Sequence, residues 1–189
     1  MRPMLDLERW AAWLRLSLDA DGSLDGMVGA CAKYLNERRG GGKPCWLTLL
    51  GKKGTGKTHC ATRVFQHIAG QSDWMAFAYL PSPVYWPKLV EELRARDDDA
   101  GMRYLELMSQ PVVLLDDIGA ERDTTGFAME KLNTLLGART GRWTIITSNL
   151  LLAHLSKSEP RIGDRIVREP GNQWAEVLAE SWALRKASQ

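Results

Sequence analysis

The sequence has no long hydrophobic run and no strong excess of charge of either sign. A membrane-spanning helix needs roughly 20 predominantly apolar residues, and no stretch of this 189-residue chain approaches that length. The N-terminal segment MRPMLDLERWAAWLRLSLDADG carries acidic residues among its apolar positions, so it lacks the apolar region of a signal peptide. These absences argue against a membrane-spanning or secreted protein, and we expect a cytoplasmic one with no membrane partner.

Cysteine and histidine are also scarce, with three of each. The cysteines are Cys31, Cys45 and Cys60, an odd number without the spacing of metal ligands. We therefore expect buried, reduced thiols. Tryptophan, in contrast, is abundant, with eight residues. Tryptophans can stack on single-stranded bases or pack in a core, and core packing is the expectation for most of them.

Length and composition describe an ordinary globular domain. The chain is long enough for one well-buried domain and short for two. Its 44% hydrophobic and 25% charged residues are typical of such a domain. A net charge of +2 is compatible with a nucleic-acid partner but does not argue for one.

The most informative stretch is LTLLGKKGTGKTHCATRVF, residues 47–65. It fits the phosphate-binding (Walker A) pattern G-x-x-x-x-G-K-[ST] with Gly51, Gly56, Lys57 and Thr58. The setting also fits, because an apolar run before the glycines predicts a buried strand and the residues after them predict a helix. Glycines let backbone N–H groups turn towards a phosphate, and the helix N-terminus adds its positive dipole.

This loop predicts an ATP site. Lys57 would reach the β- and γ-phosphates, and the Thr58 hydroxyl would ligate Mg²⁺. The residues predicted to hold the nucleotide are Gly51, Lys52, Lys53, Gly54, Thr55, Gly56, Lys57, Thr58 and His59. The alternative is a glycine-rich turn with a solvated lysine.

A pair of acids follows a second apolar run. The run VVLL at 112–115 precedes Asp116 and Asp117, as in a Walker B motif. A carboxylate at the C-terminal end of a strand beside a phosphate loop can hold Mg²⁺, which is the role predicted for Asp116. Asp117 could orient or deprotonate the attacking water. The two acids could also cap a turn before Gly119, although the apolar run and the chain order disfavour this.

Other polar side chains occur farther along the chain. An expected strand next to the Walker B strand ends in Thr147, Ser148 and Asn149. A polar side chain there could polarise the water or the γ-phosphate, although a turn or helix cap explains the Ser-Asn pair as well. The segment RIGDRIVRE offers Arg161, Arg165 and Arg168. One of them could be an arginine finger for a neighbouring subunit, a device worth roughly 10³ to 10⁵ in rate, or all three could be solvated.

Strands and helices alternate along the chain. Apolar runs predict strands at 46–50, 74–80, 111–119 and 141–149, and 172–180 favours a strand over a helix. Apolar spacing predicts helices at 5–19, 25–38, 58–68, 84–97, 102–109 and 124–139, with two short helices at 151–158 and 161–169. The acidic run at 97–99 predicts a solvated turn. Alternation of this kind predicts right-handed crossovers and a parallel sheet covered on both faces, an α/β fold of the three-layer αβα P-loop NTPase type.

Four segments together carry a family resemblance: GKKGTGKT, VVLLDDIGAE, TIITSN and GDRIVRE. In their order and approximate spacing, the chain resembles the AAA+ ATPases that load replicative helicases, the DnaC/DnaI type, and the related IstB-type transposition helpers. The terminal AESWALRK adds to the resemblance, which covers about residues 25–186. It implies an AAA+ core of about five parallel strands at 25–189, without a helical lid domain, after a helical N-terminal extension at 1–24.

The resemblance also implies roles and partners. Asn149 looks like the sensor I residue, and Arg165 looks like the arginine finger. The family implies ATP and Mg²⁺ as cofactors, ATP hydrolysis, a homo-oligomer assembled with ATP, single-stranded DNA, and a hexameric helicase of the DnaB type as partner. The basic residues that could contact DNA are Lys88, Arg94, Arg96 and Arg103. A solvated helix face explains the same charges.

The chain departs from the family in three places. Asp117 stands where glutamate is common, which predicts slow hydrolysis. Ser181-Trp182-Ala183 lacks the arginine of the usual terminal segment. Only about 45 residues precede the first expected strand, where loaders place their helicase-binding domain. The chain therefore has either a reduced contact, for which helix 5–19 is the candidate, or a different partner. Three alternatives stay open. They are an IstB-type regulator that assembles on duplex DNA, a small P-loop phosphotransferase that works as a monomer on an acceptor molecule, and a nucleotide-binding scaffold that does not hydrolyse ATP.

Overall fold

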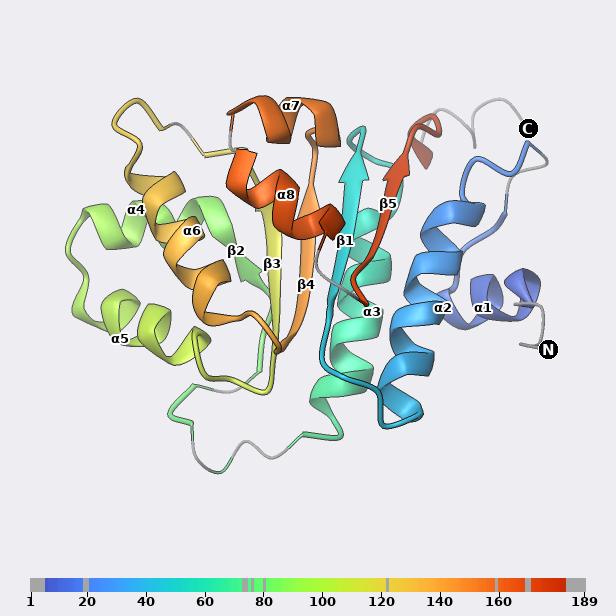
Figure 1. The fold of residues 1–189 in the computed structure, drawn as a ribbon, viewed down its shortest axis with the longest axis horizontal. Helices are drawn as coiled ribbons and strands as arrows, with labels where there is room; N and C mark the ends of the chain where they lie inside the picture. The colour runs from blue at the N-terminus through green and yellow to red at the C-terminus, as the bar shows by residue number, and fades with distance from the viewer. Residues whose placement is uncertain are drawn as a thin grey trace.

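The computed structural model describes residues 6–18, 21–72, 75, 77–79, 81–121, 123–158, 160–168 and 171–182. Within them lies one five-stranded sheet with the strand order β2-β3-β4-β1-β5 (Figure 1). All its pairings are parallel. The strands are β1 (Trp46–Gly51), β2 (Val84–Tyr85), β3 (Val112–Ile118), β4 (Trp143–Ser148) and β5 (Gln173–Val177).

Helices form the two outer layers (Figure 1). One core cluster joins the sheet to α1 (Leu7–Leu14), α2 (Asp25–Arg39) and α3 (Lys57–Ala69). The other joins it to α4 (Trp86–Arg94), α5 (Asp98–Leu107), α6 (Phe127–Ala138), α7 (Leu152–Ser158) and α8 (Pro160–Arg168). Since successive side chains of a strand face opposite ways, Leu47 and Leu49 enter the first core while Trp46 and Leu50 enter the second. The predicted three-layer αβα arrangement is confirmed.

The second strand differs from its prediction. The expected strand at 74–80 falls partly outside the described residues, and its described positions, 75 and 77–79, are turn or irregular. Met75 there is 93% exposed. The strand that pairs with β3 lies farther along, at Val84–Tyr85, immediately after Pro83. Because proline has no N–H to donate to a ladder, pairing begins only beyond it.

The acidic run at 97–99 also differs from its prediction. It begins α5, which was expected only from residue 102. The Asp97 carboxylate accepts a hydrogen bond of 2.8 Å from the Ala100 N–H and caps the helix. Asp98 and Asp99 then lie in the first turn, where the helix dipole favours negative charge.

Within the described ranges, no helix combines the length and the apolar character that crossing a bilayer requires.

Most of the described tryptophans pack in or against the core, as expected. Trp46, Trp86 and Trp143 are buried, and Trp10 and Trp13 pack partly buried against the first core. Two others, Trp174 and Trp182, are exposed. Trp74 lies outside the described residues.

The three thiols are buried and free, as predicted. Burial raises the pKa of Cys45 and of Cys60 to about 12, and raises that of Cys31 well above its usual value. Since only the thiolate reacts readily, we expect the native protein to be inert towards a thiol-specific chromogenic reagent at mildly alkaline pH. All three thiols should react once denaturant is added. A thiol that reacts fully in the native protein would contradict this burial.

Candidate nucleotide-binding site

The glycine-rich loop connects β1 to α3 through backbone conformations that favour glycine. Gly51 ends β1 with φ 120°, and a Cβ there would lie 2.2 Å from the Val177 carbonyl oxygen. Gly56 caps α3 in the left-handed region, with φ 97°. A larger residue would be strained at either position. The loop therefore leaves the N-terminus of a thirteen-residue helix facing a pocket.

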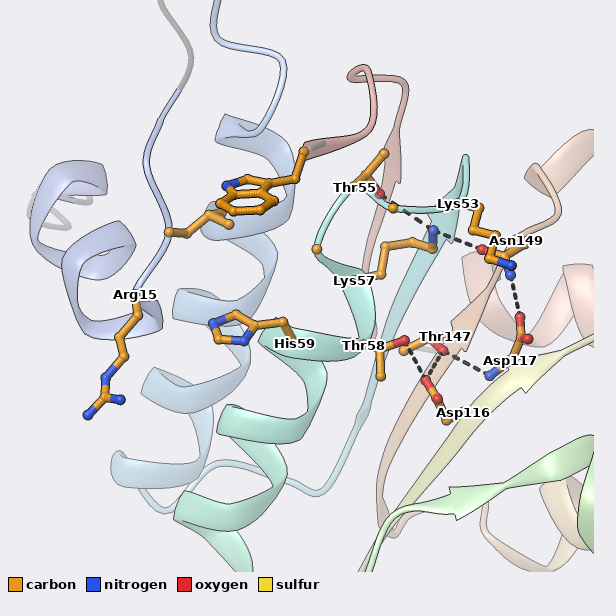
Figure 2. Close-up of a pocket in the computed structure, with 14 residues that line it drawn as sticks. Arg15, Lys53, Thr55, Lys57, Thr58, His59, Asp116, Asp117, Thr147 and Asn149 are labelled. Carbon is orange, nitrogen blue, oxygen red and sulfur yellow. Dashed lines mark hydrogen bonds between the residues drawn. The ribbon is translucent and has the colours of Figure 1, made fainter. Parts of the chain in front are cut away.

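Lys57 is the first residue of α3 and is only 5% exposed. Its Nζ donates to the Lys52 carbonyl. It also donates to Asn149 Oδ1 at 3.2 Å (Figure 2). Burial lowers the pKa of Lys57 to about 8, an effect that the carboxylates of Asp117 and Asp116 partly offset. The ammonium is thus held between the loop and the end of β4.

Asp116 lies opposite the start of α3. Its Oδ1 accepts a hydrogen bond of 2.8 Å from Thr58 Oγ1 and one of 2.6 Å from Thr147 Oγ1 (Figure 2). The hydroxyl and carboxylate predicted to hold Mg²⁺ are therefore adjacent. Oxygen donors of this kind suit a hard cation such as Mg²⁺.

Asp117 has a left-handed backbone with φ 63°. Asn149 Nδ2 donates to its Oδ1, so that Asn149 bridges Lys57 and Asp117. Burial raises the pKa of Asp117, repulsion from Asp116 adds to the rise, and the positive charge of Lys57 opposes it. The structure thus brings together Lys57, Thr58, both acids and Asn149, as the sequence predicted.

The pocket has a volume of about 610 Å³. Seven of the nine predicted loop residues line it: Lys53, Gly54, Thr55, Gly56, Lys57, Thr58 and His59. Gly51 and Lys52 are not among the lining residues. Their backbone N–H groups donate to the Leu150 and Val177 carbonyls, which ties the loop to the sheet edge.

Apart from the two acids and Asn149, the rest of the lining comes from three residues with no predicted role and from Thr147, one of the polar residues expected at the end of its strand. Arg15 and Leu16 follow α1, Thr147 lies one residue before the end of β4, and Trp182 follows β5. The Trp182 backbone N–H donates a hydrogen bond of 2.8 Å to the Gly54 carbonyl. No local pattern marks Arg15, Leu16 or Trp182, because each reaches the pocket only through the tertiary fold.

Two side chains of α3 donate hydrogen bonds to backbone carbonyls of α1. His59 Nε2 donates 2.8 Å to the Leu14 carbonyl. Arg63 donates through Nε and Nη2 to the Trp13 carbonyl, at 3.1 and 2.7 Å. The N-terminal helix is therefore bonded to the helix that begins at the phosphate loop. His59 both lines the pocket and makes this connection.

The candidate arginine finger lies away from the pocket of its own chain. Arg165 packs against α6, where a Cβ on Gly137 would lie 3.3 Å from its Nη1. Arg168 pairs with Asp164 at 2.8 Å, and Arg161 is exposed. None of the three lines the nucleotide pocket.

The candidate DNA-binding residues lie around α4 and α5. Two of them make ion pairs within the chain: Lys88 with Glu92 at 3.5 Å and Arg94 with Asp123 at 3.0 Å. Arg96 is exposed after α4, with φ 58°. Arg103 lines a second cavity of about 400 Å³ together with several acidic residues.

This fold and loop define a class: the chain has the AAA+ P-loop NTPase fold. It is 32% identical over 112 residues to the replicative helicase loader DnaI of Bacillus subtilis, a match that spans 57% of this chain and 34% of that protein. The resemblance to DnaC/DnaI-type loaders is thereby supported by sequence, although the chain matches only about a third of the relative's length.

Solved structures support the fold. A crystal structure of DnaI superposes with a TM-score of 0.65 at 24% identity, over 88% of this chain and 93% of that one. AMPPCP-bound DnaA from Aquifex aeolicus superposes with a TM-score of 0.63 at 15% identity, over 93% of this chain and 53% of that one. No protein-family model matches the sequence.

Proposed function

We propose that this protein binds ATP with Mg²⁺, hydrolyses it, and uses the cycle to load a hexameric replicative helicase onto single-stranded DNA. The proposal that the protein binds a nucleotide rests on the contacts between the phosphate loop and the acids of β3. There Thr58 contacts Asp116, and Asn149 bridges Lys57 to Asp117. The loader part is supported by the similarity to DnaI, which is named as a replicative helicase loader.

The phosphates lie, in this proposal, at the N-terminus of α3. Backbone N–H groups and the helix dipole attract the negative charge, and the Lys57 ammonium turns from its present carbonyl and amide acceptors to the phosphate oxygens. Thr58 and Asp116 supply oxygen ligands for Mg²⁺, which would neutralise charge on the β- and γ-phosphates. The AMPPCP bound by DnaA, an AAA+ neighbour in fold, supports a nucleotide as the ligand.

The chain's own groups also fit the hydrolytic step. Asp117 accepts a hydrogen bond from a water at the γ-phosphate and aligns it for attack. Its pKa, raised by burial, makes the carboxylate a stronger base than an exposed aspartate. Asn149, already bonded to Asp117, fixes the direction of that carboxylate. Arg165 of a neighbouring copy completes the site in an ATP-dependent oligomer.

We assign the base of the nucleotide to the end of the pocket lined by Leu16 and Trp182. Base–aromatic stacking is worth about 1–3 kcal/mol, so Trp182→Ala should weaken ATP binding by about 10-fold. Trp174→Ala is the matched control, because Trp174 is another exposed tryptophan near the C-terminal end but does not line the pocket. Titration of a fluorescent ATP analogue measures both. Equal affinities for the two variants would contradict the assignment.

Turnover of ATP tests the proposed function. Phosphate release should depend on Mg²⁺ and should rise when single-stranded oligonucleotide and the DnaB-type helicase of the same organism are added together. Asp117→Asn should reduce turnover while nucleotide binding persists. A rate that responds to a small acceptor molecule, but not to DNA or helicase, would contradict the proposal in favour of a phosphotransferase.

A further inference from the structure

We propose that Thr147 is a positioning residue that sets the geometry of both acids, Asp116 and Asp117, and thereby the affinity for the metal–nucleotide complex. The inference rests on the proposed function and adds a residue to it. Thr147 is the fifth residue of β4 and is 1% exposed. Its side chain lines the pocket, with hydrogen bonds to the Asp116 carboxylate and to the Asp117 backbone (Figure 2).

The backbone of β3 is irregular at Asp117. The pairing of β3 with β4 runs in register from Val112 to Leu115, then shifts before Ile118. Asp117 lies within this irregularity in a left-handed conformation that is unfavourable for a residue with a side chain. Such a conformation persists only where neighbouring groups hold it.

Thr147 stabilises this conformation of Asp117 through its hydroxyl. Its Oγ1 accepts the Asp117 backbone N–H at 3.0 Å. Because β3 is irregular here, a side chain on the neighbouring strand satisfies a donor that would otherwise be left without a partner. The bond fixes the backbone from which the Asp117 carboxylate projects towards Asn149.

The same oxygen also fixes Asp116. A hydroxyl has one donor hydrogen and two acceptor lone pairs, and Thr147 uses the hydrogen for Asp116 Oδ1 at 2.6 Å. That carboxylate oxygen is the one that meets Thr58. Thr147 thus connects the backbone of one acid to the side chain of the other, and neither valine nor alanine can make either bond.

Ser148 provides a matched control on the next residue. Its Oγ donates 2.7 Å to the Ile118 carbonyl and accepts the Leu150 N–H at 3.1 Å, so it also connects β4 to β3. It contacts neither acid in these bonds and does not line the pocket. Ser148→Ala therefore removes a comparable inter-strand hydroxyl without touching the metal ligands.

The experiment measures the affinity for a fluorescent, non-hydrolysable ATP analogue with Mg²⁺ and with a chelator. For each variant, the affinity with Mg²⁺ divided by the affinity with the chelator gives the Mg²⁺-dependent gain in affinity. Loss of one well-placed hydroxyl is worth about 1–1.5 kcal/mol, so Thr147→Val should reduce that gain by about 10-fold. Binding with the chelator should change little. Thr147→Ser should restore the gain, and Ser148→Ala should keep it even if its melting temperature falls.

A Mg²⁺-dependent gain in Thr147→Val equal to that of wild type overturns the inference, as does a loss of affinity that is the same with and without the metal. If Thr147→Val does not fold, Thr147→Cys replaces it, because a thiol of similar size is only a weak donor; an undiminished gain there overturns the inference too. Failure of the proposed function shows differently: Lys57→Ala would bind the analogue as well as wild type does.

Discussion

Replacing Lys57 with alanine is expected to lower the affinity for ATP by about 100-fold and to remove measurable hydrolysis. Charge-assisted hydrogen bonds contribute about 1.5–3 kcal/mol each, and each 1.4 kcal/mol corresponds to about tenfold in affinity. Lys57 begins α3 and its Nζ lies between the loop and Asn149, so no rearrangement of the backbone is needed for it to meet a phosphate. Isothermal titration with ATP and Mg²⁺ measures the change.

The fold should survive this substitution. Burial depresses the pKa of Lys57 to about 8, which means that the folded state keeps its ammonium at an energetic cost. Removing it should leave thermal stability unchanged or slightly higher. Lys33→Ala, on the exposed side of α2, is the control for the loss of one positive charge. An affinity for Lys57→Ala within a few-fold of that of Lys33→Ala would exclude this loop as the phosphate site.

Replacing Arg139 with methionine is expected to reduce the free energy of unfolding by about 3–5 kcal/mol, since a buried hydrogen-bond network loses its centre. Arg139 is 0% exposed. Its Nη1 donates to the Leu107 and Gln110 carbonyls, and its Nη2 donates 2.6 Å to the Trp143 carbonyl. The guanidinium therefore connects the end of α5 to the start of β4, and methionine would leave these carbonyls unsatisfied.

Arg142 offers a control three residues away. It is exposed and donates one bond of 3.2 Å to the Ser109 carbonyl. Arg142→Met should change the free energy of unfolding by less than about 0.5 kcal/mol. Urea denaturation monitored by tryptophan fluorescence gives both values. Similar losses for the two variants would mean that the buried network around Arg139 contributes no more than a surface bond.

The parts of the fold that sequence predicted well are those with strong local signals. The runs WLTLL and VVLL are continuous and apolar because β1 and β3 are buried on both faces of the sheet. The glycines and Lys57 are constrained by local backbone geometry, so the loop could be recognised from a few residues. The acids of β3 and Asn149 were placed correctly because parallel strands bring their C-terminal ends to one edge.

Other features depend on contacts between distant segments, and local patterns do not encode them. β2 has only two residues, and its position is set by pairing with Leu115 and Asp116 rather than by its own composition. Trp182 and Leu16 come from opposite ends of the chain to line one pocket. Thr147 was one of three polar residues expected at the end of its strand, but its bond to the Asp117 N–H depends on the irregularity in β3, which no local pattern encodes.

In the proposed function, nucleotide binding serves a complex with a replicative helicase. Size-exclusion chromatography with light scattering, on this protein mixed with the hexameric DnaB-type helicase of the same organism, tests it most directly. We expect a co-eluting complex of defined stoichiometry that depends on ATP and Mg²⁺ and is weakened by Lys57→Ala. Separate elution of the two proteins, with this protein self-assembling only on duplex DNA and ATP, would contradict it and favour a transposition-type regulator.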